Sequence, residues 1–263
     1  WSGLADVPEP FVPAEFFRKR FGFSPRPLQE AALRVVSELD DVGLLVIEAP
    51  MGEGKTEAAE AVVEYLARRR GFGGYLFCMP TQGTTDAMYS RVAHWSDGID
   101  RSVSASLLHG KAALNEEWVE RSAGVEFSDM YSGDEFGVDD DYGVSPKRGM
   151  ITAASAWFRG RYRGLLSPAV VATVDQGLWA ATRTRFVALR HAGLLGKIVV
   201  IDEVHAYDAY MSVFLDELVR WCARLGTPVI LMSATLPPQV RSNLVSAWCR
   251  GAGREPPEQF GVE

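Results

Sequence analysis

A glycine-rich segment near residue 50 constrains the fold of this chain more than any other feature. Its sequence is Ala49-Pro50-Met51-Gly52-Glu53-Gly54-Lys55-Thr56. An apolar run over 44–47 and Glu48 precede it, and a helical pattern over 57–70 follows it. Backbone N–H groups of such a turn, the start of the next helix and a lysine can together surround nucleotide phosphates. The segment therefore predicts a strand, a phosphate-binding loop and a helix in that order.

The rest of the chain alternates short apolar runs with helical patterns. We expect strands at 44–47, 75–78, 103–108, 170–174, 198–201 and 229–232, and helices at 56–70, 83–95, 150–161, 176–190, 208–225 and 238–250. This alternation is typical of a mostly parallel sheet with helices on both faces. With the phosphate loop after the first strand, it predicts an α/β fold of the RecA-like P-loop NTPase type.

Departures from this rhythm define the expected domain organisation. Residues 1–20, with prolines at 8, 10 and 13, are predicted to be a linker, residues 21–250 the RecA-like domain, and residues 251–263 a tail. Residues 110–149 are rich in Gly, Ser and Asp and show no clear period. We expect them to form a surface insertion that is partly disordered around 124–146.

The chemistry of the phosphate loop points to a bound nucleotide and a metal ion. Lys55 is expected to reach the β- and γ-phosphates of ATP, and Thr56 is expected to coordinate Mg²⁺. Most phosphate loops have a glycine where this chain has Ala49, and the alanine variant is common in helicases. The candidate ATP-binding residues of the segment are Met51, Gly52, Glu53, Gly54, Lys55, Thr56 and Glu57.

A second motif supplies two adjacent acids. Asp202 and Glu203 follow the apolar run 198–201, at the carboxyl end of a buried strand, where open α/β sheets bind ligands. Asp202 suits Mg²⁺, and Glu203 is a candidate to orient or deprotonate the attacking water. By themselves the two acids would equally fit a solvated strand end. Together with Lys55, they are the candidate catalytic residues of an ATP-hydrolysing motor.

The acidic motif also carries a specific family resemblance. The segment Asp202-Glu203-Val204-His205-Ala206-Tyr207-Asp208 resembles the motif of the helicase-nuclease in type I CRISPR interference, a superfamily 2 helicase. The supporting segments are 48–57, Met79-Pro80-Thr81-Gln82, Ala172-Thr173-Val174-Asp175-Gln176 and Ser233-Ala234-Thr235-Leu236-Pro237. The match covers about residues 20–245, which correspond to the first of the two RecA-like domains in such enzymes.

The resemblance implies further site residues. Gln29 matches a glutamine that reads adenine, although a lone glutamine is more often a helix-surface residue. His205 would couple the acidic motif to Ser233 and Thr235, and strand-end packing is an equal alternative for it. Contacts with the backbone of single-stranded DNA are implied for Thr81, Gln82, Thr173, Asp175 and Gln176.

The same resemblance implies cofactors and partners. The cofactors would be ATP and Mg²⁺, the substrate single-stranded DNA, and the partner the Cascade surveillance complex, which marks the DNA to be degraded. A metal-dependent HD-type nuclease domain would lie upstream of Trp1, because none of the four histidines is followed by an aspartate. A second RecA-like domain of the same polypeptide would follow Glu263.

Composition limits the cellular setting. No apolar run approaches the roughly 18 residues of a membrane span and no signal-peptide pattern is present, so we expect a cytoplasmic protein without a membrane partner. The net charge is −7, but seven of the 34 acids lie between Ser122 and Pro146, where there is no Lys or Arg. The rest of the chain has as many acids as bases, so its acidity does not exclude a nucleic-acid partner.

Two alternatives stay open at this point. Another superfamily 2 DNA or RNA helicase or translocase would carry the same ATP-binding residues. A nucleotide-gated docking module belongs to a different functional class, and in that case the acidic insertion is where a partner would bind.

Overall fold

The computed structural model of the chain describes residues 6–7, 9–39, 43–99, 105–123, 163–182 and 186–256. The helix expected at 150–161 and the disorder expected around 124–146 lie outside these residues. All six expected strands are found within them.

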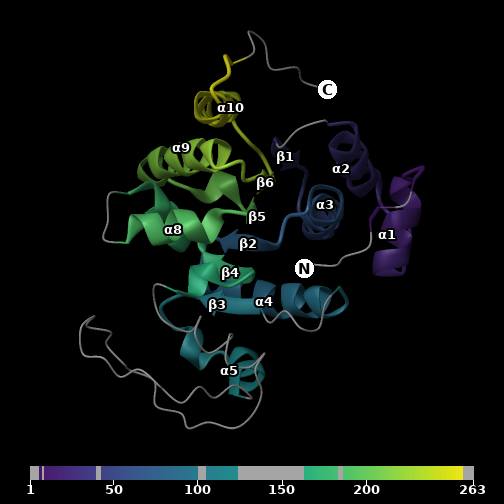
Figure 1. Ribbon diagram of the computed structural model, residues 1–263, viewed down its shortest axis with the longest axis horizontal. Coiled ribbons are helices and arrows are strands. Elements are labelled where there is room, and N and C mark those ends of the chain that lie inside the picture. Colours follow the sequence, from purple (N-terminus) through teal and green to yellow (C-terminus); the bar gives the residue numbers. More distant parts are fainter. Residues whose placement is uncertain are drawn as a thin grey trace.

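A six-stranded parallel sheet forms the centre of the molecule (Figure 1). The strands are β1 (Leu44–Glu48), β2 (Gly74–Met79), β3 (Ala105–Leu108), β4 (Ala169–Thr173), β5 (Lys197–Ile201) and β6 (Val229–Ser233). Their order across the sheet is β1-β6-β5-β2-β4-β3. Each strand is a mainly apolar run, because a parallel strand that is covered on both faces buries both rows of side chains. The expected α/β fold is confirmed.

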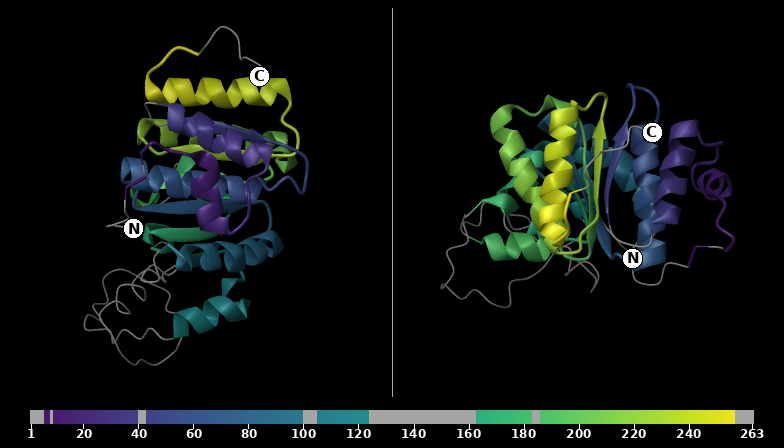
Figure 2. Two further views of the ribbon diagram at one scale, coloured as in Figure 1. Left: turned by 90° about the vertical axis from the view of Figure 1, so that its right-hand side faces the viewer. Right: turned by 90° about the horizontal axis from the view of Figure 1, so that it is seen from above.

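Helices cover both faces of the sheet (Figure 2). One face carries α1 (Pro13–Phe21), α2 (Pro27–Glu38), α3 (Lys55–Arg70) and α4 (Gln82–Asp97). The other face carries α7 (Val174–Leu178), α8 (Val187–Leu194), α9 (Ala209–Arg224) and α10 (Pro238–Ala252). The short helix α5 (Glu116–Ala123) lies beyond α4 (Figure 1). No helix within the described ranges is both long and apolar enough to cross a membrane.

Each strand contributes to two apolar cores in alternation. In β2, Tyr75 and Phe77 belong to the core under α1 to α4, whereas Leu76 and Cys78 belong to the core under α7 to α10. This follows from the two-residue period of a strand. Because all strands run in one direction, the loops that follow β1, β5 and β6 meet at a single edge of the sheet.

The prediction of a single helix over 176–190 is wrong. Helix α7 ends at Leu178, a 3₁₀ turn (η3, Trp179–Ala181) follows, and α8 begins only at Val187. Phe186, just before α8, has a φ of 66°, a left-handed conformation that a right-handed helix cannot contain. The apolar pattern runs across this interruption, so periodicity does not reveal it.

Helices α1, α2 and α5 occur where the sequence predicts none. Helix α1 lies largely in the segment expected to be a linker, yet its Phe17 is fully buried in the core. Residues 13–20 are therefore packed on the domain and do not form a free linker. Helix α5 lies in the expected insertion and starts after Asn115, whose side chain accepts the N–H of Trp118 at 2.9 Å. The limits proposed for the linker, the domain and the tail stay predictions.

Candidate nucleotide-binding site

The phosphate loop connects the end of β1 to the start of α3. Gly52 and Gly54 have φ values of 83° and 79°, which other residues adopt only at an energetic cost. A Cβ on Gly54 would also lie 2.3 Å from Nε2 of Gln29, so any side chain there would displace the Gln29 amide. Lys55 begins α3, is buried, and donates a hydrogen bond from Nζ to the carbonyl of Ala49 at 2.7 Å. The lysine therefore lies against the inside of the loop.

Gln29 of α2 is only 1% exposed and joins the loop to the residues before α2. Its Oε1 accepts the backbone N–H of Arg26 at 2.8 Å, and its Nε2 donates to the carbonyl of Gly54 at 3.2 Å. Both ends of the amide are thus engaged. Gln29 therefore lies at the site and supports the phosphate loop. Its Nε2 has a second N–H and its Oε1 a second lone pair, so the expected contact with adenine stays a prediction.

Asp202 and Glu203 stand at the end of β5. Asp202 donates its N–H to the carbonyl of Cys78 at 3.0 Å, and its Oδ1 accepts the N–H of Glu203 at 2.8 Å. Burial raises the pKa of Asp202, and the N–H of Glu203 and the charge of Lys55 offset this in part. Glu203 has a φ of 52°, a left-handed conformation that costs about 1 kcal/mol. Desolvation and backbone strain of this kind cluster at functional sites.

His205 connects the acidic motif to the end of β6. Its Nδ1 lies 3.1 Å from Oγ of Ser233 and 3.2 Å from Oε2 of Glu203. The Ser233 hydroxyl donates to the carbonyl of Thr235 at 2.7 Å. Because that hydroxyl has a single proton, it accepts from an N–H at Nδ1 of His205. The three residues expected to couple the motifs therefore lie in one continuous chain of hydrogen bonds.

A pocket of about 290 Å³ joins the phosphate loop to the two acids. Lys55 and Thr56 at the start of α3 line this pocket, and so do Asp202 and Glu203 after β5. Of the residues expected to bind ATP, Glu53 is not among the lining residues and instead pairs with Arg26 at 4.0 Å. The remaining lining residues are Phe23, Arg26, Gln29, Met51, Gly52, Gly54, Glu57 and Arg91.

Thr56 and Asp202 fit a Mg²⁺ ion. Over the described part of the chain, no group of three or more His, Cys, Asp and Glu residues is arranged to hold a metal by itself. Mg²⁺ generally takes one or two protein ligands and completes its octahedral shell with water and substrate phosphates. One hydroxyl and one carboxylate that line the same pocket meet this requirement.

Phe23, Arg26 and Arg91 are lining residues that the sequence reasoning missed. Phe23 and Arg26 lie a few positions before Gln29, so proximity to an expected site residue was a usable signal. Arg91 comes from the middle of α4 and pairs with Glu57 at 2.8 Å. No sequence pattern marks it, because only the tertiary fold brings this side chain of α4 to the pocket.

Known proteins resemble this chain along almost its whole length, although no protein-family model matches it. The CRISPR-associated nuclease/helicase Cas3 of Streptococcus thermophilus is 41% identical over 251 residues, which cover 94% of this chain and 26% of that relative. A crystal structure of T. fusca Cas3 with ATP has a TM-score of 0.75 at 35% identity and covers 98% of this chain and 26% of that one. Along almost its whole length, this chain is therefore homologous to one region of the Cas3 nuclease/helicases.

The chain spans about a quarter of the length of these Cas3 relatives. Crystal structures of T. fusca Cas3 with ADP and with AMPPNP each match it with a TM-score of 0.74. A chain of a CRISPR RNA-guided surveillance complex, described as pre-nicking, matches it with a TM-score of 0.59 at 31% identity over 95% of this chain and 23% of that one.

The residues expected to contact nucleic acid lie at the same sheet edge as the pocket. Thr81 caps α4 with its side chain, and both Thr81 and Gln82 are exposed. Asp175 is exposed near the start of α7 and accepts a hydrogen bond from Gln176 at 3.1 Å. Thr173 is only 6% exposed. The surface here therefore presents Thr81, Gln82, Asp175 and Gln176, while the side chain of Thr173 is covered.

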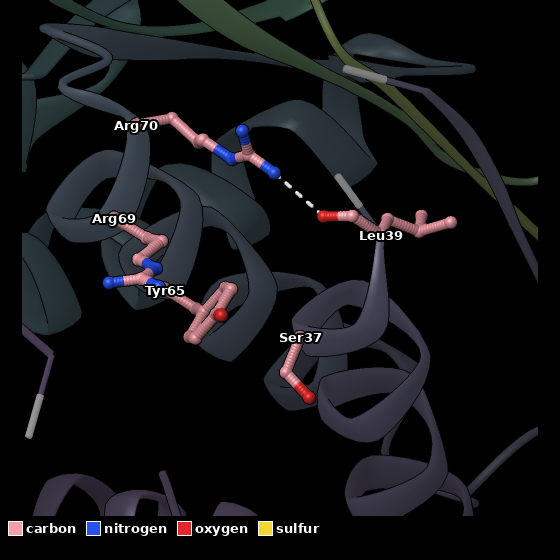
Figure 3. Close-up of a pocket in the computed structure, with 5 residues that line it drawn as sticks. All are labelled: Ser37, Leu39, Tyr65, Arg69 and Arg70. Carbon is pink, nitrogen blue, oxygen red and sulfur yellow. Dashed lines mark hydrogen bonds between the residues drawn. The ribbon is translucent and has the colours of Figure 1, made fainter. Parts of the chain in front are cut away.

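A second hollow, of about 300 Å³, lies at the far end of α3 (Figure 3). Arg70 donates to the carbonyl of Leu39 at 2.6 Å, and Arg69 pairs with Glu9 at 2.8 Å. Lys55 begins α3 and Arg70 ends it, so about 22 Å of helix separates this hollow from the phosphate loop. It belongs to the packing of α2 on α3 and not to the nucleotide site.

Proposed function

We propose that this chain is the ATP-binding motor lobe of an ATP-dependent DNA helicase or translocase that acts in CRISPR antiviral defence. The observation that carries the proposal is the convergence of Lys55 and Asp202 on one pocket. The Cas3 relatives, which are named nuclease/helicase, support the class of enzyme. The proposed cofactors are ATP and Mg²⁺.

In the proposed mechanism, the N–H groups of the loop and the start of α3 bind the phosphates. Lys55 exchanges its bond to the Ala49 carbonyl for the terminal phosphates, because a phosphate oxygen is a charged and stronger acceptor. Thr56 and Asp202 would hold Mg²⁺, which when bound would neutralise phosphate charge. Glu203 orients the attacking water and accepts its proton.

The chain of hydrogen bonds through His205 is proposed to report the state of the nucleotide. Glu203 contacts His205, and His205 contacts Ser233. The carboxylate of Glu203 and the hydroxyl of Ser233 both accept from the same Nδ1–H of His205. When Glu203 turns toward the attacking water, His205 therefore bonds more strongly to Ser233. The change in the His205–Ser233 hydrogen bond then shifts the turn from Ser233 to Thr235, which leads to the surface.

Single-stranded DNA is the proposed substrate at the neighbouring strand ends. Hydroxyl and amide groups bind phosphates without a large positive charge, and Thr81, Gln82 and Gln176 supply such groups. We further propose an HD-type nuclease domain and a second RecA-like domain in the intact polypeptide, in line with the greater length of the Cas3 relatives. The match to a chain of a surveillance complex supports Cascade as the partner.

The test is a Lys55→Ala substitution in the intact protein. We expect ATP-dependent unwinding to fall by about 100-fold or more, because the lysine meets charge on the transferred phosphate. Nuclease action on bare single strands should be unchanged. Lys19→Ala, at an exposed lysine of α1, is the matched control and should leave both activities at the wild-type level.

Three outcomes would count against the proposal in different ways. Unwinding at the wild-type rate by Lys55→Ala would contradict the role of the pocket. Loss of both activities together would contradict separate active sites. ATP hydrolysis stimulated by RNA and not by DNA would favour a different superfamily 2 motor.

A further inference from the structure

Glu48 links the phosphate loop to the segment after β6, which contains Leu236 and Arg241. It is the last residue of β1 and stands directly before the loop. Its Oε1 accepts the backbone N–H of Leu236 at 3.1 Å, and its Oε2 forms an ion pair with the guanidinium of Arg241. The side chains of Glu48 and Arg241 are 33% and 27% exposed, so the pair is partly shielded from water.

The main chain fastens the same two segments together. Strands β1 and β6 are neighbours, and Glu48 is in register with Ser233. The N–H of Ala49, the first residue of the loop, donates to the carbonyl of Ser233 at 3.1 Å. The turn after β6 is therefore held by β1 and Glu48 from one direction and by His205 from the other.

The carboxylate of Glu48 also provides a negative charge near the N-terminus of α10, where the helix has none of its own. Helix α10 begins at Pro238 with no side-chain cap and no acid in its first turn, although Arg241 is close to that end. The N-terminus of a helix carries partial positive charge, which favours a nearby anion and disfavours a nearby cation. Glu48 neutralises Arg241 and places a negative charge near this end. The start of α10 is thus stabilised by a residue of the strand that leads into the phosphate loop.

We infer that Glu48 is a positioning residue that, with Arg241, couples the phosphate loop to the turn at 233–236 and to the start of α10. The inference rests on the proposed function and adds a second connection beside the one through His205. A shift of the loop when phosphates bind moves Glu48, and Glu48 moves Leu236 and Arg241 with it. Removing the pair should therefore separate ATP hydrolysis from the movement of DNA.

The first experiment compares Glu48→Gln, Arg241→Gln and the double variant in the intact protein. Glu48→Gln keeps an oxygen acceptor for the N–H of Leu236 and removes only the charge. We expect the number of base pairs unwound per ATP hydrolysed to fall roughly fivefold to tenfold in each single variant. The KM for ATP should stay within about twofold, because neither residue lines the pocket. The double variant should be no worse than either single one, since the two residues act as a unit.

Arg220→Gln is the matched control. Arg220 pairs with Glu217 on α9 at 34% and 35% exposure, close to the values of the pair under test. This variant should keep wild-type unwinding per ATP and a similar melting temperature. If Glu48→Gln and Arg241→Gln behave like Arg220→Gln, or lower hydrolysis and unwinding by one common factor, the inference is wrong.

Hydrogen exchange separates this inference from the proposed function. Glu48→Ala should speed exchange of the Leu236 amide about tenfold, because that N–H loses its acceptor. AMPPNP should change exchange over 234–241 in the wild type and leave it unchanged in Glu48→Ala. Failure of AMPPNP to bind the wild type would overturn the proposed function together with this inference. AMPPNP binding with the same response in both proteins would overturn the inference alone.

Discussion

At the scale of single residues, the end of β5 combines two unfavourable features. Asp202 is a carboxyl whose pKa is raised by burial, and Glu203 has a left-handed backbone. Each lowers the stability of the free protein without improving its packing. The proposed function gives a reason for their presence, because a metal ion bound by Asp202 would recover the cost of its desolvation.

Asp202→Asn is therefore expected to stabilise the free protein while weakening Mg²⁺-dependent nucleotide binding about tenfold or more. Between the unfolded-state pKa near 4 and the raised native pKa, the native state binds more protons than the unfolded state, so the free energy of unfolding falls as pH rises. Above the native pKa the penalty is complete. The gain from Asp202→Asn, on the order of 1 kcal/mol, should be largest there and vanish near pH 4. Denaturant unfolding from pH 4 to 8 measures it.

Asp216→Asn on α9 is the control for this prediction. Burial also raises the pKa of Asp216, but this residue does not line the pocket. The control should gain stability with the same sign of pH dependence and keep its nucleotide affinity. Equal losses of affinity in the two variants would show that the effect of Asp202→Asn is structural.

Some site residues can be predicted from the sequence and others cannot, for a physical reason. The convergence of Lys55 and Asp202 follows from local motifs at strand ends, since parallel strands end at a common edge. Glu48 and Arg91 acquire their partners only through the packing of distant elements. Gln29 is an intermediate case, because its place at the site was expected but its two bonds to the backbone were not.

At the scale of elements, strands were easier to predict than helices. A strand buried on both faces is a nearly continuous apolar run, and the first four residues of β6, Val229 to Met232, fit this rule. A helical sequence pattern, in contrast, does not show at which residue the helix ends. The pattern over 176–190 continues through η3, whose end is fixed by tertiary contacts such as the bond from Nε2 of His191 to the carbonyl of Ala180 at 2.8 Å.

Strand β5 contains one charged residue, Lys197, whose burial costs free energy. Lys197 begins the strand, is 4% exposed and donates from Nζ to the carbonyl of Leu165. Desolvation lowers its pKa to about 7. From there up to the unfolded-state pKa near 10.5, the unfolded chain binds a proton that the native state lacks, so stability rises with pH. Below pH 7 both states are protonated and the cost of burying the charge is complete.

Lys197→Met should therefore stabilise the protein by roughly 1 to 3 kcal/mol at pH 6, after the loss of the bond to the Leu165 carbonyl is allowed for. The gain should shrink steadily as the pH approaches 10. Denaturant unfolding at pH 6, 8 and 10 measures it, with Lys19→Met at an exposed position as the control. A gain that is equal at pH 6 and pH 10 would show that the ammonium is not desolvated in the native state.

At the scale of the whole molecule, the pocket has little free positive charge for a reaction in which negative charge shifts between phosphates. Arg91 is paired with Glu57, and Arg26 contacts the carbonyl of Gly52 and the carboxylate of Glu53. Among the described residues that line the pocket, Lys55 is the one cation placed at the loop for the terminal phosphates. The described residues that line the pocket therefore supply no further free arginine for the transition state, and we predict that a second RecA-like domain of the intact polypeptide supplies it.

The isolated chain should therefore bind Mg²⁺-ATP weakly and hydrolyse it at least about 1,000-fold more slowly than the intact protein, the factor typical of an absent arginine finger. Binding of a fluorescent ATP analogue to residues 1–263 and steady-state hydrolysis with and without single-stranded DNA provide the measurement. Lys55→Ala in the same chain should abolish the residual binding, which distinguishes an incomplete site from an absent one. Strong stimulation of hydrolysis by DNA in the isolated chain would mean that this lobe contains every catalytic group it needs, and the proposed division of the site between two lobes would then be wrong.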